Sequence, residues 1–496
     1  MHALLTAAVA LCAACANRSP YTCTVSDQCV LGGASGFCEP EGFCSFPDPE
    51  CDGGRRFEPN AGNGLGGTCA MGVPDDAPPM ACGAVGQPAC SGEPACVAGT
   101  FSQDGTCQQC VTDVAIGHRY VCQTKYDKTI WCSGENTQGQ LGNGVKGMPE
   151  LIPTVVKDAA GPLTDVTALN MGYEVTCAVR GASGNVWCWG RGGDGQLGTG
   201  GTPMAETPVP VRVVMQNGMP LANIVQVDGG YGHMCGRDTN NEVWCWGRNG
   251  SGQLGNGTNL PANQNFATRV LSTMGGTPFT GATELFAGGD FTCVTKATDE
   301  IWCWGGNYDG QLGDNMTTDR LVPFTATRSR SASAGIFHLC AVNADSSVSC
   351  AGANYHAQLG NGTGGGFNGN DQDTLEKVLS APGGGPQLNV AKVVAAGPMS
   401  CALMQDKTVK CWGDTFFGST GTGTGSQYAV DVLARTPTGA TKLEGVDKLR
   451  ARYPRACAHT ESGTWMCWGR GRSGEWGNNK VVDRGLAEPL TGVTCP

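Results

Sequence analysis

One sequence unit recurs seven times from Val111 onward and constrains the fold of this chain more than any other feature. Each copy places a cysteine before a glycine-rich turn sequence, as in VWCWGRNGSGQLGNG and IWCWGGNYDGQLGDN. A repeat of this length predicts stacked copies of one supersecondary unit, as in a solenoid or propeller, rather than independent domains. The repeated cysteines lie 47 to 61 residues apart, at Cys132, Cys188, Cys245, Cys303, Cys350, Cys411 and Cys467.

A second cysteine lies upstream of the first in every copy, at a separation of 10 residues in six copies and 11 in the other. Turn sequences such as RDTNNE and KATDE lie between the two, with β-branched and aromatic residues on both sides, which predicts a β-hairpin. Opposed residues of a hairpin lie close enough for a disulfide, worth roughly 2–3 kcal/mol for a loop of this size. The predicted bridges are Cys122–Cys132, Cys177–Cys188, Cys235–Cys245, Cys293–Cys303, Cys340–Cys350, Cys401–Cys411 and Cys457–Cys467.

The repeat resembles that of the regulator of chromosome condensation family, which reads approximately G-x-x-H-S-L-A-L…G-x-V-Y-S-W-G-x-N-x-x-G-Q-L-G. The copy GGYGHMCGRDTNNEVWCWGRNGSGQLGNG follows this pattern closely, and the match recurs across residues 111–496. The resemblance implies an all-β fold, a seven-bladed β-propeller with four-stranded blades. Propellers bring their first and last strands together. Cys495 has no partner within its repeat, so we expect it to bridge Cys107 or Cys110 and lock the ring.

Residues 15–110 form a cysteine-rich segment with no sustained helical or strand periodicity. Such a segment cannot bury a conventional core, so we expect disulfides to hold it as a small irregular stalk before the propeller. A Pro- and Asp-rich stretch at 73–80 divides it into two modules, about 16–72 and 81–110. The CxxC of Cys107 and Cys110 has no second copy at zinc-ribbon spacing, which favours structural bridging over a metal or redox site.

The 28 cysteines of the chain suit an oxidising compartment, where thiols pair. Residues 1–14 resemble a secretory signal peptide of the bacterial lipoprotein type, with Cys15 as the residue to be lipidated. Ala13 and Ala14 fit that pattern, whereas Cys12 and the lack of Lys or Arg depart from it. We therefore expect a secreted or cell-surface protein, lipid-anchored in a bacterial outer membrane through Cys15 only. An ordinary cleaved signal is the alternative.

The composition and motifs argue against catalysis and nucleic-acid binding. Only 15% of residues are charged and the net charge is −11, whereas nucleic-acid binding needs clustered Lys and Arg. There is no HExxH, GxxxxGK[ST] or GxSxG motif. His233 and His338 occupy the G-x-x-H column, where we expect a structural hydrogen bond within the blade. We expect no catalytic residue, metal or cofactor, because this column forms no ring of ligands: its other members are Tyr120, Val175, Phe291, Met399 and Arg455.

The loop after each W-G, or its equivalent, varies between copies, and aromatic residues gather there in copies four, five and six. Equivalent loops of a propeller lie on one face, so we predict an exposed aromatic patch of Tyr308, Tyr355, Phe416 and Phe417, with His356 beside it. The alternative is that these rings pack locally on neighbouring loops. The recurrent tryptophans, by contrast, are expected to pack the blades.

Function must be argued from the surfaces of a propeller, because the fold alone serves many functions. We expect a monomeric, non-enzymatic binding protein, outside the cell or in its envelope, whose propeller loops engage a protein or glycan partner. The alternative is a secreted inhibitor of an extracellular enzyme that acts through an aromatic propeller face.

Overall fold

The computed structural model describes residues 111–490 except 365–369, 423–425, 438 and 453, and the backbone of eight short strands before them. The chain forms two compact units, residues 1–97 with 102–107, and residues 98–101 with 108–496. The predicted signal peptide, Cys15, the cysteine side chains of the stalk and the Cys495 bridge lie outside the described residues. The short strands are β1 (Val30–Leu31), β2 (Ala34–Ser35), β3 (Phe37–Cys38), β4 (Cys44–Pro47), β5 (Arg55–Phe57), β6 (Cys69–Ala70), β7 (Thr100–Gln103) and β8 (Thr106–Gln109).

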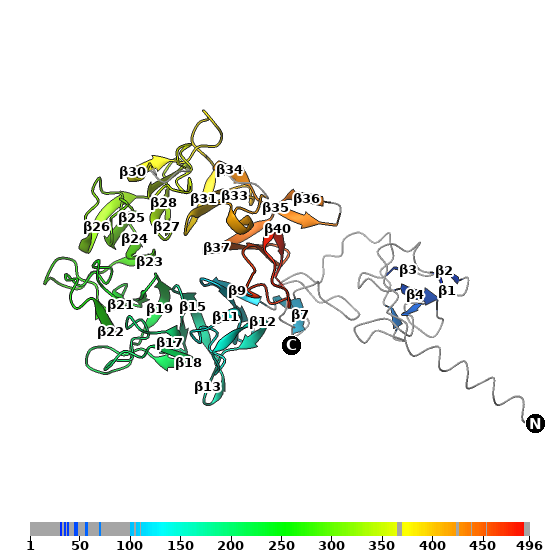
Figure 1. Ribbon diagram of the computed structural model, residues 1–496, viewed down its shortest axis with the longest axis horizontal. Helices are drawn as coiled ribbons and strands as arrows, with labels where there is room; N and C mark the ends of the chain where they lie inside the picture. Colours follow the sequence, from blue (N-terminus) through cyan, green and yellow to red (C-terminus); the bar gives the residue numbers. More distant parts are fainter. Residues whose placement is uncertain are drawn as a thin grey trace, which may run out of the picture. The chain divides into compact units, whose positions relative to one another are not determined.

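Seven blades follow one another around a ring in the order of the sequence (Figure 1), so the expected all-β, seven-bladed propeller with four-stranded blades is confirmed. Each blade is an antiparallel meander whose first strand is innermost. Blade 1 contains β9 (Val111–Ile116), β10 (Tyr120–Lys125), β11 (Ile130–Asn136) and β12 (Gly147–Val155). Blade 2 contains β15 (Val166–Met171), β16 (Val175–Arg180), β17 (Asn185–Arg191) and β18 (Glu206–Arg212).

The remaining blades repeat this order. Blade 3 contains β19 (Ile224–Gly229), β20 (His233–Asp238), β21 (Val243–Arg248) and β22 (Asn263–Arg269), and blade 4 contains β23 (Ala282–Ala287), β24 (Phe291–Lys296), β25 (Glu300–Gly305) and β26 (Arg320–Arg328). Blade 5 contains β27 (Ser331–Ala334), β28 (His338–Val342), β29 (Val348–Gly352) and β30 (Gln372–Lys377), and blade 6 contains β31 (Val390–Ala396), β32 (Met399–Met404), β33 (Val409–Gly413) and β34 (Ser426–Asp431). Blade 7 contains β37 (Val446–Arg452), β38 (Arg455–Thr460), β39 (Trp465–Gly469) and β40 (Arg484–Pro489).

Two short hairpins lie outside this plan. The first pairs β13 (Lys157–Asp158) with β14 (Gly161–Pro162). The second pairs β35 (Leu433–Thr436) with β36 (Gly439–Lys442), and β35 also pairs in parallel with β40, which widens blade 7 to six strands.

Each blade carries one buried disulfide between its second and third strands. The two cysteines are directly opposed in the strand register, as for Cys235 and Cys245, and their Cα atoms lie 4.1 Å apart. The strand–turn–strand spacing of the sequence therefore corresponds to the central hairpin of every blade. The bridges are Cys122–Cys132, Cys177–Cys188, Cys235–Cys245, Cys293–Cys303, Cys340–Cys350, Cys401–Cys411 and Cys457–Cys467.

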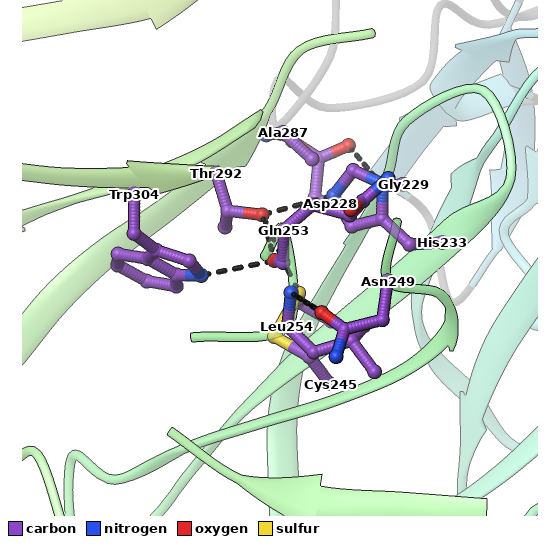
Figure 2. The surroundings of a disulfide bond; sticks show 11 residues. Asp228, Gly229, His233, Cys245, Asn249, Gln253, Leu254, Ala287, Thr292 and Trp304 are labelled. Atoms are coloured by element: carbon purple, nitrogen blue, oxygen red, sulfur yellow. Dashed lines mark hydrogen bonds between the residues drawn. A yellow bond between two sulfur atoms is a disulfide. The ribbon is translucent and has the colours of Figure 1, made fainter. Parts of the chain in front are cut away.

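The tryptophan after the second cysteine joins its blade to the preceding one. Between blades 3 and 4, the backbone oxygen of Gln253 accepts hydrogen bonds from Trp304 Nε1 at 2.9 Å and from Thr292 Oγ1 at 3.1 Å (Figure 2). All of these groups are buried, where an unmade hydrogen bond would be costly. The same tryptophan bond recurs at four other joints, from Trp189 to Gln140, Trp246 to Gln196, Trp412 to Gln358 and Trp468 to Ser419.

The glycine-rich turn serves this joint. The Asn249 Oδ1 accepts a hydrogen bond from the backbone N–H of Leu254 at 3.1 Å, and the Gln253 side chain accepts one from the N–H of Ser251 at 2.9 Å. Gly255 has a positive φ of 62°, and a Cβ there would lie 2.7 Å from Trp304 Nε1. Only glycine fits such a position without displacing the indole. The N-x-x-x-Q-L-G motif is thus a turn shaped around the tryptophan of the next blade.

The histidines of the G-x-x-H column act between blades, which corrects the expected bond within one blade. His233 Nε2 lies 2.9 Å from Thr292 Oγ1 in blade 4, and His338 Nε2 lies 2.7 Å from Ser400 Oγ in blade 6. Thr292 Oγ1 donates its proton to the backbone oxygen of Gln253, so in the bond with His233 the Nε2–H of the imidazole is the donor and Thr292 Oγ1 the acceptor. Burial lowers the pKa of both histidines to about 3, which keeps the rings neutral at ordinary pH.

The joint that closes the ring, between blades 7 and 1, is built differently. Ser133 stands where most blades carry the joint tryptophan, and its Oγ donates to the backbone oxygen of Glu475 at 3.0 Å. Trp476 replaces the leucine of the turn and is fully buried among residues of both blades, including Val114 and Val121. Blade 1 thus lacks the joint indole at Ser133, and the indole of Trp476 in blade 7 fills this joint instead.

A buried ion pair completes the same joint. Arg455 and Glu475 have no exposed side-chain surface, and Arg455 Nη1 lies 2.8 Å from Glu475 Oε1. Arg455 Nη2 also donates to the backbone oxygen of Gly117 in blade 1 at 2.6 Å. The pair thus links the last blade to the first through Arg455 Nη2, and its two opposite charges are paired, as burial of an ion favours.

We predict that Trp476→Leu, which restores the residue of the other turns, lowers the free energy of unfolding by about 2–4 kcal/mol because it leaves a void at the closing joint. Adding Ser133→Trp should recover at least half of that loss. Urea unfolding monitored by circular dichroism measures both, with Trp187→Leu as a control at a partly exposed tryptophan. Equal midpoints for wild type and Trp476→Leu would contradict this account of the joint.

Candidate binding face

The first loop of each blade, between its first and second strands, lies on the same face as the third loop, between its third and fourth strands. This follows from the antiparallel order of the four strands. The first loops of blades 1 to 5 are also joined by backbone hydrogen bonds. These run from His118 N to Tyr173 O (3.1 Å), Tyr173 N to Gly230 O (3.0 Å), Tyr231 N to Gly289 O (2.8 Å) and Gly289 N to Ile336 O (2.9 Å).

These first loops hold a continuous chain of aromatic rings. His118 stacks on Tyr173 with ring centroids 3.8 Å apart, and Tyr173 meets Tyr231 edge-on at 5.1 Å. Tyr231 in turn meets Phe337 of blade 5 edge-on at 6.0 Å. Offset stacking and edge-to-face contacts are the favoured arrangements of aromatic pairs. These four rings therefore form one ordered aromatic surface rather than a set of separate rings.

A pocket of about 400 Å³ opens beside this chain and also involves the third loops of blades 4 and 5. We call it the aromatic pocket. A cavity of this size, with apolar rings and a few polar groups, is typical of a binding site. Its lining residues are His118, Tyr173, Tyr231, Asp309, Ile336, Phe337, Tyr355, His356, Gln358 and Pro398.

The five residues of the predicted aromatic patch divide into three groups. Tyr355 and His356 line the aromatic pocket. Tyr308 and Phe416 are exposed outside its lining, with 84% and 62% of their surfaces accessible. Phe417 is not among the exposed residues: its ring lies beneath the guanidinium groups of Arg470 and Arg472, at 5.2 and 4.8 Å. Local packing therefore describes Phe417 but not Tyr308 or Phe416.

Sequence reasoning missed the aromatic residues of the first loops. These residues occupy the two variable positions of the G-x-x-H pattern: His118, Tyr173 and Tyr231 lie two residues before the position of the histidine, and Phe337 lies one residue before it. The signal was present, since three of the seven copies place an aromatic or imidazole ring directly after the glycine. It could not be recognised alone, because the side-by-side packing of these loops depends on the closed ring.

Asp309 lines the aromatic pocket, and a second carboxylate, Asp371, lies outside the lining but interacts with both Asp309 and Tyr355. Burial, and then the charge of Asp371, raises the pKa of Asp309 to about 6. The Tyr355 hydroxyl lies between them: burial raises the pKa of Tyr355 to about 12, helped by its hydrogen bond to Asp371 and by the charges of both acids. Asp371 also accepts a hydrogen bond from the backbone N–H of Asn354 at 2.8 Å, which holds its position.

The opposite end of the pocket is electropositive. Burial, and then the charges of Arg455, Arg119, Arg470 and Arg452, lowers the pKa of His118 to about 3, so the imidazole is neutral. The pocket is therefore polarised, with arginines beyond His118 and carboxylates beyond Tyr355.

The central channel is a less suitable site. The seven innermost strands surround a cavity of about 360 Å³. Its charged side chains are engaged with each other or with the backbone. Arg450 lies 3.3 Å from Asp113, Lys392 lies 3.6 Å from Glu284, and Arg452 donates to the backbone oxygens of Met171 and Gly229.

Among the described residues, no three His, Cys, Asp or Glu side chains converge as metal ligands would. In the same part of the chain, no helix has the length and apolar character needed to cross a bilayer.

The fold defines the class of protein as a seven-bladed β-propeller with four-stranded blades. The model of the RCC1-like domain family matches residues 80–424, well over half of the chain. The chain therefore belongs to the RCC1-like domain family.

Relatives in this family have diverse roles. The ultraviolet-B receptor UVR8 of Arabidopsis thaliana is 26% identical over 367 residues, which cover 74% of this chain and 78% of the receptor. The mouse E3 ubiquitin-protein ligase HERC2 is 26% identical over 343 residues, 69% of this chain but only 6% of the ligase.

Solved structures of low identity share the fold. Human WBSCR16 is 18% identical, with a TM-score of 0.59 over 73% of this chain and 94% of that one. Prp20p of Saccharomyces cerevisiae is 20% identical, with a TM-score of 0.57 over 75% of this chain and 88% of that one.

We predict that Asp309→Asn stabilises the protein at pH 7.5 but not at pH 4. The raised pKa of Asp309 means that the folded state binds its proton more tightly than the unfolded state, so stability is lost progressively as the pH rises from about 4 to about 6, and the full cost of the carboxylate is present at pH 7.5. Because the side chain is partly solvated, we expect a rise in Tm of only about 1–2 °C, measured by differential scanning calorimetry.

Asp314→Asn is the matched control, because Asp314 lies 2.6 Å from Arg320 and should stabilise as the charged form. Its substitution should lower the Tm at pH 7.5. If Asp309→Asn also lowers the Tm at that pH, the ionised Asp309 side chain does not destabilise the folded protein, and the prediction is wrong.

Proposed function

We propose that this chain is a non-enzymatic binding protein that works outside the cytosol and holds a protein partner on the face of the aromatic pocket. The observation that carries the proposal is the aromatic chain from His118 to Phe337 beside a pocket that Tyr355 also lines. Tyr308 and Phe416 extend this apolar surface with exposed rings. Aromatic side chains are enriched in the hot spots of protein interfaces, so a cluster of them on one face favours a binding role.

The relatives favour a protein as the partner. Yeast RCC1 has been solved bound to Kap60, and the study of Prp20p concerns its binding to Gsp1p and histones. HERC2 is an E3 ubiquitin-protein ligase, but this chain matches only 6% of its length. The family therefore supports recognition by the propeller rather than catalysis.

The cysteines support a place of action in an oxidising compartment. Each of the seven blades contains a disulfide whose sulfur atoms are buried, and such bridges persist where thiols are not kept reduced. The apolar segment before Cys15 supports export by a signal peptide. We therefore propose a secreted or cell-surface protein, anchored by lipid at Cys15.

We predict that the triple variant Tyr308→Ala, Tyr355→Ala, Phe416→Ala loses at least tenfold of the affinity for the native partner. Three exposed rings that each contribute about 0.5–1.5 kcal/mol would account for such a loss. The measurement is quantitative capture of envelope and extracellular proteins of the source organism by the purified propeller, with the captured partner then titrated by biolayer interferometry.

The control variant removes apolar side chains from the loops that join successive blades on the opposite face. It combines Met219→Ala, Met274→Ala and Leu388→Ala, at residues that are 58%, 70% and 46% exposed. The control should bind like the wild type. If the triple aromatic variant captures the same partners with the same affinity, this face is not the binding surface.

A further inference from the structure

The acidic end of the aromatic pocket lacks the counter-charges that several other acids of this face have. Neither Asp309 nor Asp371 forms an ion pair with any described residue. Among the other carboxylates of the first and third loops, Asp319 and Asp414 likewise have no such partner in the described part of the chain, whereas others do, including Glu174 with Arg191 (3.8 Å), Asp194 with Arg191 (3.2 Å), Asp290 with Arg248 (3.5 Å) and Asp483 with Arg472 (2.7 Å). Two carboxylates that share one tyrosine hydroxyl repel each other, and no Lys or Arg of the described residues pairs with either of them.

Aromatic rings stand next to this unpaired charge. Tyr355 and Phe337 are 39% and 41% exposed, and both line the pocket together with the half-buried rings of Tyr173 and Tyr231. The face of an aromatic ring carries negative potential and attracts cations within about 6 Å of its centroid. Rings and carboxylates therefore favour the same kind of ligand, a positively charged group on an apolar stem.

We infer that the aromatic pocket binds the side chain of a lysine or arginine of the protein partner, with its stem along the rings of Phe337 and Tyr231 and its charged group beside Asp309 and Asp371. This inference rests on the proposed function, because it names the group by which the partner is recognised. A long cationic side chain matches the pocket in both respects, since its methylene stem packs on apolar surface while its charge remains near polar groups.

The charges around the pocket also determine the direction of entry. The charges of four arginines act on His118, although two of them, Arg455 and Arg119, are paired with carboxylates, whereas Asp309 and Asp371 have no paired cation among the described residues and attract one. An anionic ligand would be repelled by the carboxylates of Asp309 and Asp371. A neutral sugar could stack on the rings but would leave the repulsion between Asp309 and Asp371 unrelieved. A basic side chain is the ligand that can both pack on the aromatic rings and offset the negative charge of the two acids.

The test uses small blocked amino acids as probes and the full-length protein. Nα-acetyl-lysine methylamide and Nα-acetyl-arginine methylamide are compared with Nα-acetyl-norleucine methylamide, which has the lysine stem without its charge, and with triacetylchitotriose as a neutral saccharide. Binding at pH 7.5 is measured by saturation-transfer NMR titration. We expect at least one cationic probe to bind tenfold or more tightly than norleucine.

Three variants locate the site. The double variant Asp309→Asn, Asp371→Asn should reduce the affinity for the cationic probe to that for norleucine. Phe337→Leu, at an exposed ring, should weaken it two- to fivefold. Asp483→Asn is the matched control, because Asp483 accepts a backbone N–H from Gly471 just as Asp371 does from Asn354, but in blade 7. This control should bind like the wild type, and the Tm of each variant verifies folding.

Equal affinity for the norleucine and cationic probes would overturn the inference, as would tighter binding of the saccharide or an unaltered affinity of a folded double Asp variant. The proposed function fails separately. If partner capture depends on Tyr308, Tyr355 and Phe416 while the cationic probes show no preference, the binding face stands and only the identity of the recognised group is wrong.

Discussion

At most joints, one backbone carbonyl oxygen in the turn after the third strand is the contact on which the propeller depends. At five of the seven joints it accepts the indole N–H of a tryptophan in the next blade, as the oxygen of Gln253 does from Trp304. The turn must bring this oxygen to a buried site and leave room for the indole, which is why its Asn, Gln and Gly recur. The disulfide beside it keeps the hairpin that carries the tryptophan intact.

This joint also determines what the protein can present to a partner. Because neighbouring blades are held in register, their first loops lie side by side and hydrogen-bond to one another. His118, Tyr173, Tyr231 and Phe337 then form one surface although they come from four different blades. The rigid ring thus pre-organises the aromatic rings, and pre-organisation reduces the cost of ordering side chains on binding.

Much of this architecture could be predicted from the sequence. The regular spacing of cysteine pairs indicated hairpins, and the recurrence of the turn indicated a propeller, because both signals are local and repeated. The closing joint was not predicted, since Ser133 and Trp476 lie far apart in the sequence and each looks like an isolated departure from the repeat. Only the closed ring shows that one departure compensates for the other.

The sequence points to only part of the candidate binding face, for the same reason. Tyr355 and His356 can be singled out because the third loops vary visibly between copies, and their role in binding stays a prediction. The first-loop rings were missed because their importance comes from contact with other blades rather than from their own repeat. The raised pKa of Asp309 likewise depends on the fold, first through burial and then through the charge of Asp371, which lies beyond the next turn sequence.

We propose that the face of the aromatic pocket is the binding surface of the propeller. Hydrogen–deuterium exchange of the protein with and without its captured partner tests this assignment. We expect slower exchange on complex formation at residues 117–120, 172–175, 230–233, 335–338 and 354–358. Protection confined to the opposite face, at residues 216–223, 273–281 and 381–389, with no change in the first and third loops, would contradict it.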